Sequence, residues 1–170
     1  MEILEKFMSG DQVEMWEAAK TLAAERNPDL APRLLEIMES SPDTQRRVAA
    51  AWILGFLHSS DALESMIRIL DDESQPAALR DHAAEALGHI SDSRARDVLI
   101  RNLFDKDPDI SFSCAFALRT VGTTKDIFHL EQLAANSSLV NSYGASVAQE
   151  AREAADQIRK RETPDEPKQA

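Results

Sequence analysis

The sequence predicts an all-α fold, a right-handed solenoid of about five antiparallel helix pairs. A run of small residues ending in Leu recurs along the chain, and its leucines, Leu22, Leu54, Leu87 and Leu118, lie 32, 33 and 31 positions apart. Ala, Leu, Glu and Asp dominate the composition, and no segment alternates β-branched with aromatic residues, so helix is favoured over sheet. A repeat of this length indicates stacked units, none of which buries its apolar face alone.

Helix-capping residues divide the chain into the elements of these units. They occur at 10–11, 42–44, 91–93, 107–109 and 123–124, each before an apolar-periodic run. The predicted helix pairs are 2–8 with 11–26, 28–40 with 43–58, 60–71 with 75–90, 92–105 with 108–121, and 124–136 with 139–160. Because the connections are short, sequential helices should pack as antiparallel neighbours.

These pairs form one predicted domain, 1–160, with irregular capping units at both ends. The last ten residues, 161–170, are rich in charge and Pro and carry nothing to bury. We expect them to form a disordered tail.

The repeated motif resembles the HEAT-like repeats of the phycobilisome-lyase type. That pattern has Val-Arg, two variable residues, Ala-Ala, one variable residue and Ala-Leu-Gly, followed by a second helix with Leu every four residues. The segment 79–90, LRDHAAEALGHI, matches it best, 46–55 follows, and 110–118 is degraded, with Arg119 in the Gly position. The resemblance covers about 11–136 and implies an armadillo-like superhelix whose Ala-Leu-Gly helices line the concave face.

In that arrangement the variable positions of the inner helices form columns along a groove. Large rings fall there four residues apart, Trp52 with Phe56 and Phe112 with Phe116, on a face that the pattern leaves outside the core. The candidate partner-binding residues are Trp16, Trp52, Phe56, Asp81, His82, Glu85, His89, Phe112 and Phe116. The hypothesis is a groove with aromatic walls and an acidic, His-bearing centre that holds a peptide or helix of another protein. The alternative is that the rings only pack against adjacent units.

No metal or cofactor is predicted at this face. His82, Glu85 and His89 share one side of a helix, but seven residues separate the two His backbones by about 10 Å. That span is too long for joint ligation at about 2.0–2.1 Å per bond. Iron-binding HEAT-like hydroxylases use adjacent His-Glu pairs, and the sequence has no His-Glu dipeptide.

Catalytic residues are not predicted either. Cys114, the single cysteine, occupies a small-residue packing position, and we expect it in the core. The sequence contains no nucleophile-elbow motif, no phosphate-cradling Gly loop and no zinc-ligand spacing. We therefore predict that the chain is not an enzyme.

The net charge of −11 disfavours nucleic acid and anionic membranes as partners. The first residues, MEILEK, do not resemble a signal peptide, and no apolar run approaches the roughly 20 residues of a membrane span. We expect a cytoplasmic protein, with a monomer favoured.

The sequence thus predicts a non-enzymatic interaction module or scaffold that binds another protein in its concave groove. Two other classes stay open. One is a chromophore-lyase-like enzyme subunit, which the family resemblance suggests. The other is a small acidic inhibitor or immunity-type protein, which the net charge suggests.

Overall fold

The computed structural model describes residues 2–162, and over this range the fold consists of ten α-helices with short connections. The helices are α1 (Glu2–Ser9), α2 (Gln12–Glu25), α3 (Ala31–Ser40), α4 (Thr44–Phe56), α5 (Leu63–Asp71), α6 (Ala77–Ile90), α7 (Arg96–Asn102), α8 (Pro108–Val121), α9 (Ile127–Asn136) and α10 (Val147–Glu162). A single turn of 3₁₀ helix leads into each of α3, α5, α7 and α9.

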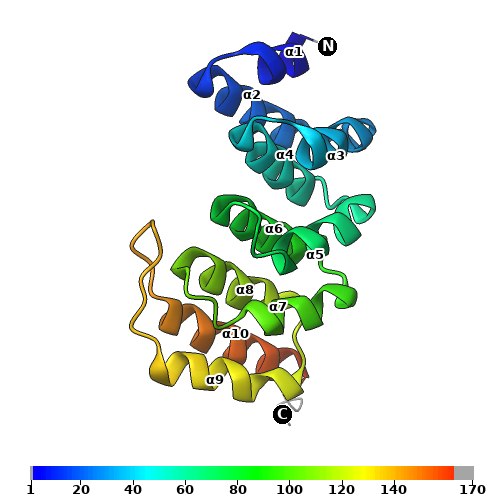
Figure 1. The fold of residues 1–170 in the computed structure, drawn as a ribbon. Helices are drawn as coiled ribbons and strands as arrows, with labels where there is room; N and C mark the ends of the chain where they lie inside the picture. The colour runs from blue at the N-terminus through cyan, green and yellow to red at the C-terminus, as the bar shows by residue number, and fades with distance from the viewer. Residues whose placement is uncertain (1, 163–170) are drawn as a thin grey trace, which may run out of the picture.

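The helices stack as antiparallel pairs in chain order (Figure 1). Helix α1 lies at one end of the stack, and α9 and α10 lie at the other. One layer contains α2, α4, α6, α8 and α10, in which each helix contacts the next, while α3, α5 and α7 pack against the following inner helix from the other side. The predicted all-α solenoid of five helix pairs is confirmed.

Local chemistry starts the helices where the sequence indicated. Asp11 accepts hydrogen bonds from the amides of Val13 and Glu14, and the Glu14 carboxylate accepts one from the amide of Asp11. Asp43 caps α4 and Asp107 caps α8 in the same way. These side chains satisfy amides that have no partner inside the helix.

The repeated glycines bring adjacent inner helices into direct backbone contact. A Cβ on Gly55 would lie 2.9 Å from the Cα of Ala86, and one on Gly88 would lie 2.8 Å from the Cα of Ala117. Arg119 occupies the corresponding position in the next unit, and its guanidinium donates to Glu150 and Glu153 of α10, each at 2.6 Å. An ion-pair contact therefore replaces the glycine contact between α8 and α10.

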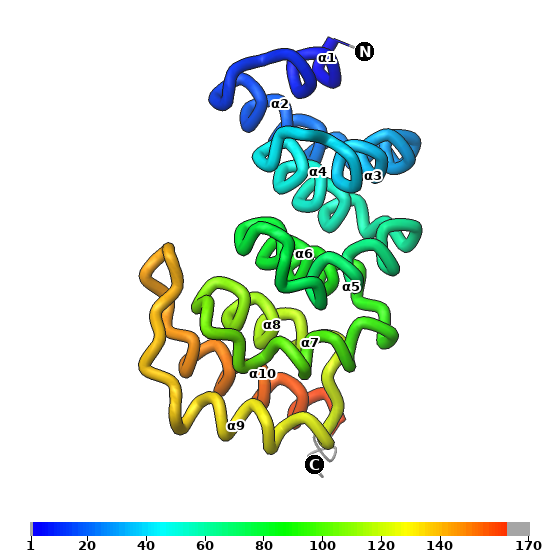
Figure 2. The backbone as a smooth tube through the Cα atoms, in the orientation of Figure 1, coloured from blue at the N-terminus to red at the C-terminus, as the bar shows by residue number. Residues whose placement is uncertain are grey.

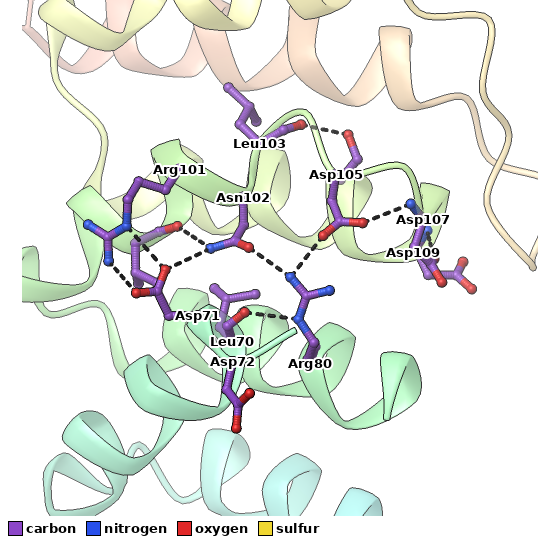
Figure 3. Close-up of polar contacts among 12 residues, drawn as sticks. Leu70, Asp71, Asp72, Arg80, Arg101, Asn102, Leu103, Asp105, Asp107 and Asp109 are labelled. Atoms are coloured by element: carbon purple, nitrogen blue, oxygen red, sulfur yellow. Dashed lines mark hydrogen bonds and ion pairs between the residues drawn. The ribbon is translucent and has the colours of Figure 1, made fainter. Parts of the chain in front are cut away.

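A buried arginine network joins the third and fourth units (Figure 3). Arg80 of α6 donates from Nε to the carbonyl of Leu70 at 3.0 Å, and from Nη2 to Asn102 and Asp105 at 2.8 Å each. Arg47 makes the equivalent bond to the carbonyl of Met38 one unit earlier, at 2.7 Å. The inner helices are thus tied to the ends of the outer helices at a fixed register.

The prediction of a helix over 139–160 is wrong at its start. Residues 137–146 form a short hairpin in which Val140 and Ser146 make an antiparallel bridge and Gly144 adopts φ 82° (Figure 2). Gly is favoured there because a left-handed backbone conformation costs it little. Helix α10 begins only at Val147.

The expected disordered tail also starts too early. Arg161 and Glu162 complete α10, and Arg161 donates from Nη1 to the carbonyl of Arg119 at 2.5 Å. The rest of the expected tail, 163–170, lies outside the described residues, and the domain extent of 1–160 stays a prediction.

Candidate functional site

Rings from four successive inner helices meet in one row along the inner layer. Trp16 of α2 packs edge-on against Trp52 of α4 with ring centroids 6.1 Å apart, and Trp52 packs against Phe56 at 4.7 Å. Phe56 contacts His89 of α6 at 4.8 Å, and His89 contacts Phe116 of α8 at 5.7 Å. These separations and tilted geometries are those at which aromatic rings attract one another.

These rings pack against adjacent units, as one of the two interpretations from the sequence expects, and their role in binding a partner stays a prediction. All nine candidate residues are half-buried. Trp16, Trp52, Phe56 and Phe112 pack against the hydrophobic core. The rings support one another across the units and keep part of their surface free.

Six of the nine candidates also line one cavity of about 280 Å³ between α4, α6 and α8. Its lining consists of Trp52, Asp81, His82, Glu85, Phe112 and Phe116, together with Asp109, Ser113, Asn141 and Tyr143. We call this cavity the α6–α8 pocket. Trp16, Phe56 and His89 lie outside it, in the row of rings.

Sequence reasoning missed the side of the pocket that the hairpin 137–146 supplies. The amide of Ser142 donates to Oδ1 of Asp109 at 2.7 Å and holds the hairpin against the start of α8. Tyr143, next in the chain, is 85% exposed and lies at the pocket edge. The turn residues Asn141 and Gly144 are the signal that could have indicated this hairpin.

The pocket carries negative charge that no Lys or Arg neutralises. Asp81, Glu85 and Asp109 line it, and within residues 2–162 none of the three pairs with a Lys or Arg. Asp81 instead accepts a hydrogen bond from Ser113 Oγ at 2.5 Å and lies 3.4 Å from Nδ1 of His82.

On the outer face of the stack, several carboxylates pair with arginines of adjacent units. Examples are Arg96 with Asp126, at 2.6 Å, and Arg101 with Asp71, at 3.0 Å. The three acids of the α6–α8 pocket have no such arginine partner.

The pKa of His82 reflects this surrounding charge. Burial by itself would lower it, but the hydrogen bond to Asp81 and the charges of Asp81 and Glu85 outweigh burial, so the pKa lies above its ordinary value of 6.5. Cys114 is buried, as expected, and burial raises the pKa of its thiol. Such a thiol forms little of the reactive thiolate.

The His and acidic side chains of the site make pairs and not larger clusters. His89 Nε2 lies 3.8 Å from Glu85 Oε1, and His82 contacts Asp81. Over residues 2–162, no three His, Cys, Asp or Glu side chains converge as ligands of one ion. None of the helices in the same range is both long and apolar enough to cross a membrane.

Stacked helix pairs with packing glycines and a ring-lined inner face define a helical-repeat solenoid. Residues 73–154 match the family model of the HEAT repeats. This segment is just under half of the chain and resembles HEAT repeats, and the helix pairs before it continue the same stack.

Similar proteins carry several different names. Deoxyhypusine hydroxylase-B of Oryza sativa subsp. japonica is 29% identical over 120 residues, which is 69% of this chain and 40% of that protein. The chain therefore spans well under half the length of this relative.

Among solved structures, the complex of CpcE and CpcF of phycocyanin lyase from Nostoc sp. PCC7120 matches with a TM-score of 0.73. The match has 15% identity and covers 90% of this chain and 95% of that one. An engineered protein matches with a TM-score of 0.60 and 20% identity, over 92% and 78%. At these identities the likeness establishes the fold.

Proposed function

We propose that this chain is a non-enzymatic protein-interaction module that binds an extended or helical segment of another protein along its inner face. The observation that carries the proposal is the row of rings from Trp16 to Phe116, which crosses four units and adjoins the α6–α8 pocket. Aromatic residues are enriched at the centres of protein interfaces, and Trp is among the residues that carry most of the binding energy there.

The mechanism is a preformed surface. Each ring of the row is held by its neighbours, and Trp16, Trp52 and Phe56 also pack against the core, so little side-chain freedom is lost when a partner covers them. Because the inner helices are fixed by glycine contacts and by the Arg80 network, the spacing of the anchors is fixed as well. The partner segment becomes ordered on binding, whereas this chain presents a surface that is already formed.

The acidic charge of the inner face indicates which class of partner the chain binds. An acidic inner face repels nucleic acid and anionic lipid, so a protein partner is favoured. A single thiol held in the core suits the reducing cytoplasm, where we expect the chain to act as a monomer.

The enzymatic alternative is a chromophore-lyase-like subunit, and the match to the phycocyanin-lyase complex over 90% of this chain is what favours it. A tetrapyrrole would then occupy the ring-lined face in place of a peptide. Titration of the chain with a bilin separates the two proposals, because binding in a rigid groove should shift and sharpen the bilin absorbance. An unchanged spectrum would exclude this alternative.

Selection from a displayed library of random peptides tests the interaction module. We expect peptides selected on the wild-type chain to bind the Trp52→Asp/Phe116→Asp variant about tenfold or more weakly, since two anchors are lost. Phe128→Asp is the matched control, because Phe128 is 63% exposed on α9, away from the row of rings. Equal binding to wild type, control and groove variant would refute the proposal.

The two groove substitutions also disturb ring packing, so a variant that leaves it intact is needed. Glu85→Lys reverses one charge at the centre of the inner face and removes no ring. Circular dichroism and thermal unfolding of each variant then separate loss of binding from loss of fold.

A further inference from the structure

We infer that the α6–α8 pocket binds the side chain of an arginine in the partner segment. This inference rests on the proposed function, since it assigns the chemistry of one position in the bound segment. Two independent features of the pocket, its charge and its walls, point to the same ligand.

The negative charge of the pocket favours a cationic ligand. The carboxylate of Glu85 accepts no hydrogen bond within the described part of the chain, and its basic neighbours are two histidines, His89 at 3.8 Å and His82. Asp109 uses Oδ1 to hold Ser142, which leaves Oδ2 free. With Asp81, three carboxylates from two helices face a partly enclosed space without a Lys or Arg partner, so their potential is focused there.

The aromatic walls of the pocket favour a planar cation that can stack on them. Trp52, Phe112, Phe116 and Tyr143 line the same cavity as the carboxylates. A guanidinium stacks on aromatic faces, and its five donors lie in one plane, so it can reach separate acceptors while stacked. A lysine ammonium is a compact point charge and meets only part of this arrangement.

Phe116 already has a guanidinium beside it. The Arg119 guanidinium carbon lies 5.7 Å from the centre of the Phe116 ring. That arginine donates to Glu150 and Glu153, and these carboxylates balance its charge, so it does not neutralise the pocket.

The size of the pocket suits one side chain. Its volume of about 280 Å³ lies just below the range of about 300–1,000 Å³ that is usual for small-molecule sites. The hairpin 137–146 supplies the outer wall, with Tyr143 at its tip and Ser142 bound to Asp109. A larger ligand would have to displace that wall.

Titration of the ¹⁵N-labelled chain with N-acetyl-arginine methylamide, followed by NMR, tests the inference. We expect saturable shifts confined to amides of α6, α8 and 137–146. The citrulline derivative, which is neutral and nearly isosteric, should bind about tenfold or more weakly, and the lysine derivative several-fold more weakly. Equal binding of arginine and citrulline, shifts elsewhere in the chain, or tighter binding of lysine would overturn the assignment.

A pair of variants with the same change in net charge separates the pocket from the general acidity of the chain. Glu85→Gln should weaken the arginine derivative about tenfold. Glu25→Gln, at the exposed end of α2, should leave its affinity unchanged. If the two variants weaken binding equally, the attraction belongs to the whole surface and the pocket is not the site.

The outcomes also distinguish this inference from the proposed function. Groove-dependent peptides that lack arginine, together with a failed titration, would remove the pocket assignment and keep the interaction module. Binding of the arginine derivative in the pocket without any groove-dependent peptide would keep the pocket as a site for a guanidinium and remove the interaction module.

Discussion

Arg80 of α6 and Asp105, in the turn between α7 and α8, form an ion pair whose nearest atoms are 2.8 Å apart. Both side chains are largely buried, with 7% and 12% of their surfaces exposed. The same guanidinium holds the carbonyl of Leu70 at the end of α5 (Figure 3). One side chain thus sets the register of two repeat units, and the next residue, Asp81, lies in the α6–α8 pocket.

Replacement of this arginine should destabilise the stack strongly. Arg80→Met leaves Asp105 and the Leu70 carbonyl without their partner, and loss of one member of a buried pair typically costs about 3–5 kcal/mol. Urea unfolding followed by circular dichroism measures the free energy of unfolding. Arg68→Met is the control, since Arg68 pairs with Glu39 on the surface. A loss no larger than that of the control would contradict the structural role of Arg80.

A second prediction concerns the close contact of α6 with α8 at Gly88. Gly88→Ala should gain about 1 kcal/mol from helix propensity. It should lose more from overpacking, which typically costs about 1–3 kcal/mol, because the new Cβ meets backbone of Ala117 at 2.8 Å. We expect a lower thermal midpoint, and the same sign for Gly55→Ala against Ala86. A raised midpoint in either variant would show that the helices separate easily.

Most of the fold could be predicted because its signals are local. The small residues that recur before Leu54, Leu87 and Leu118 determine which helix face is buried, and Asp11, Asp43 and Asp107 mark where helices begin. The rings of the inner face follow from the same 3.6-residue period. These features need no knowledge of contacts between distant residues.

The rest depends on contacts between residues that are distant in the sequence, and only the turn of the hairpin 137–146 has a local signal. Asp109 looked like an ordinary capping residue, and its place in the pocket follows from a bond to Ser142, 33 positions later. The predicted helix over 139–160 includes most of the hairpin because the alanines after it favour helix strongly, although Asn141 and Gly144 favour a turn. The partners of Arg80, 10 to 25 positions away, were likewise outside any sequence period.

His82 should make the stability of the chain depend on pH. Its pKa in the folded protein lies above 6.5, because Asp81 and Glu85 outweigh the effect of burial. A raised pKa means that the folded state holds the proton more tightly than the unfolded state does. This stabilisation is complete below about pH 6.5 and is lost as the pH rises through the folded-state value.

Unfolding midpoints measured from pH 5.5 to 8.5 test this expectation. The difference in stability between wild type and His82→Gln should shrink as the pH rises. His129→Gln is the control, because His129 is exposed on α9. Parallel profiles for wild type and His82→Gln would mean that the pair of His82 with Asp81 does not form.

The bond from Ser142 to Asp109 should decide the order of the hairpin 137–146 without deciding the stability of the stack. Asp109→Ala removes the acceptor that holds the Ser142 amide at 2.7 Å. An exposed turn that is released from its anchor opens more often, so its amides should exchange with deuterium about tenfold faster, while amides of α6 and α8 keep their protection. Asp29→Ala, on the exposed 3₁₀ turn before α3, should change neither. Unchanged exchange in the hairpin would mean that its own bonds, such as Asn141 to Ala145, suffice to hold it. Faster exchange throughout the chain would mean instead that the wall of the pocket is part of the core of the fold.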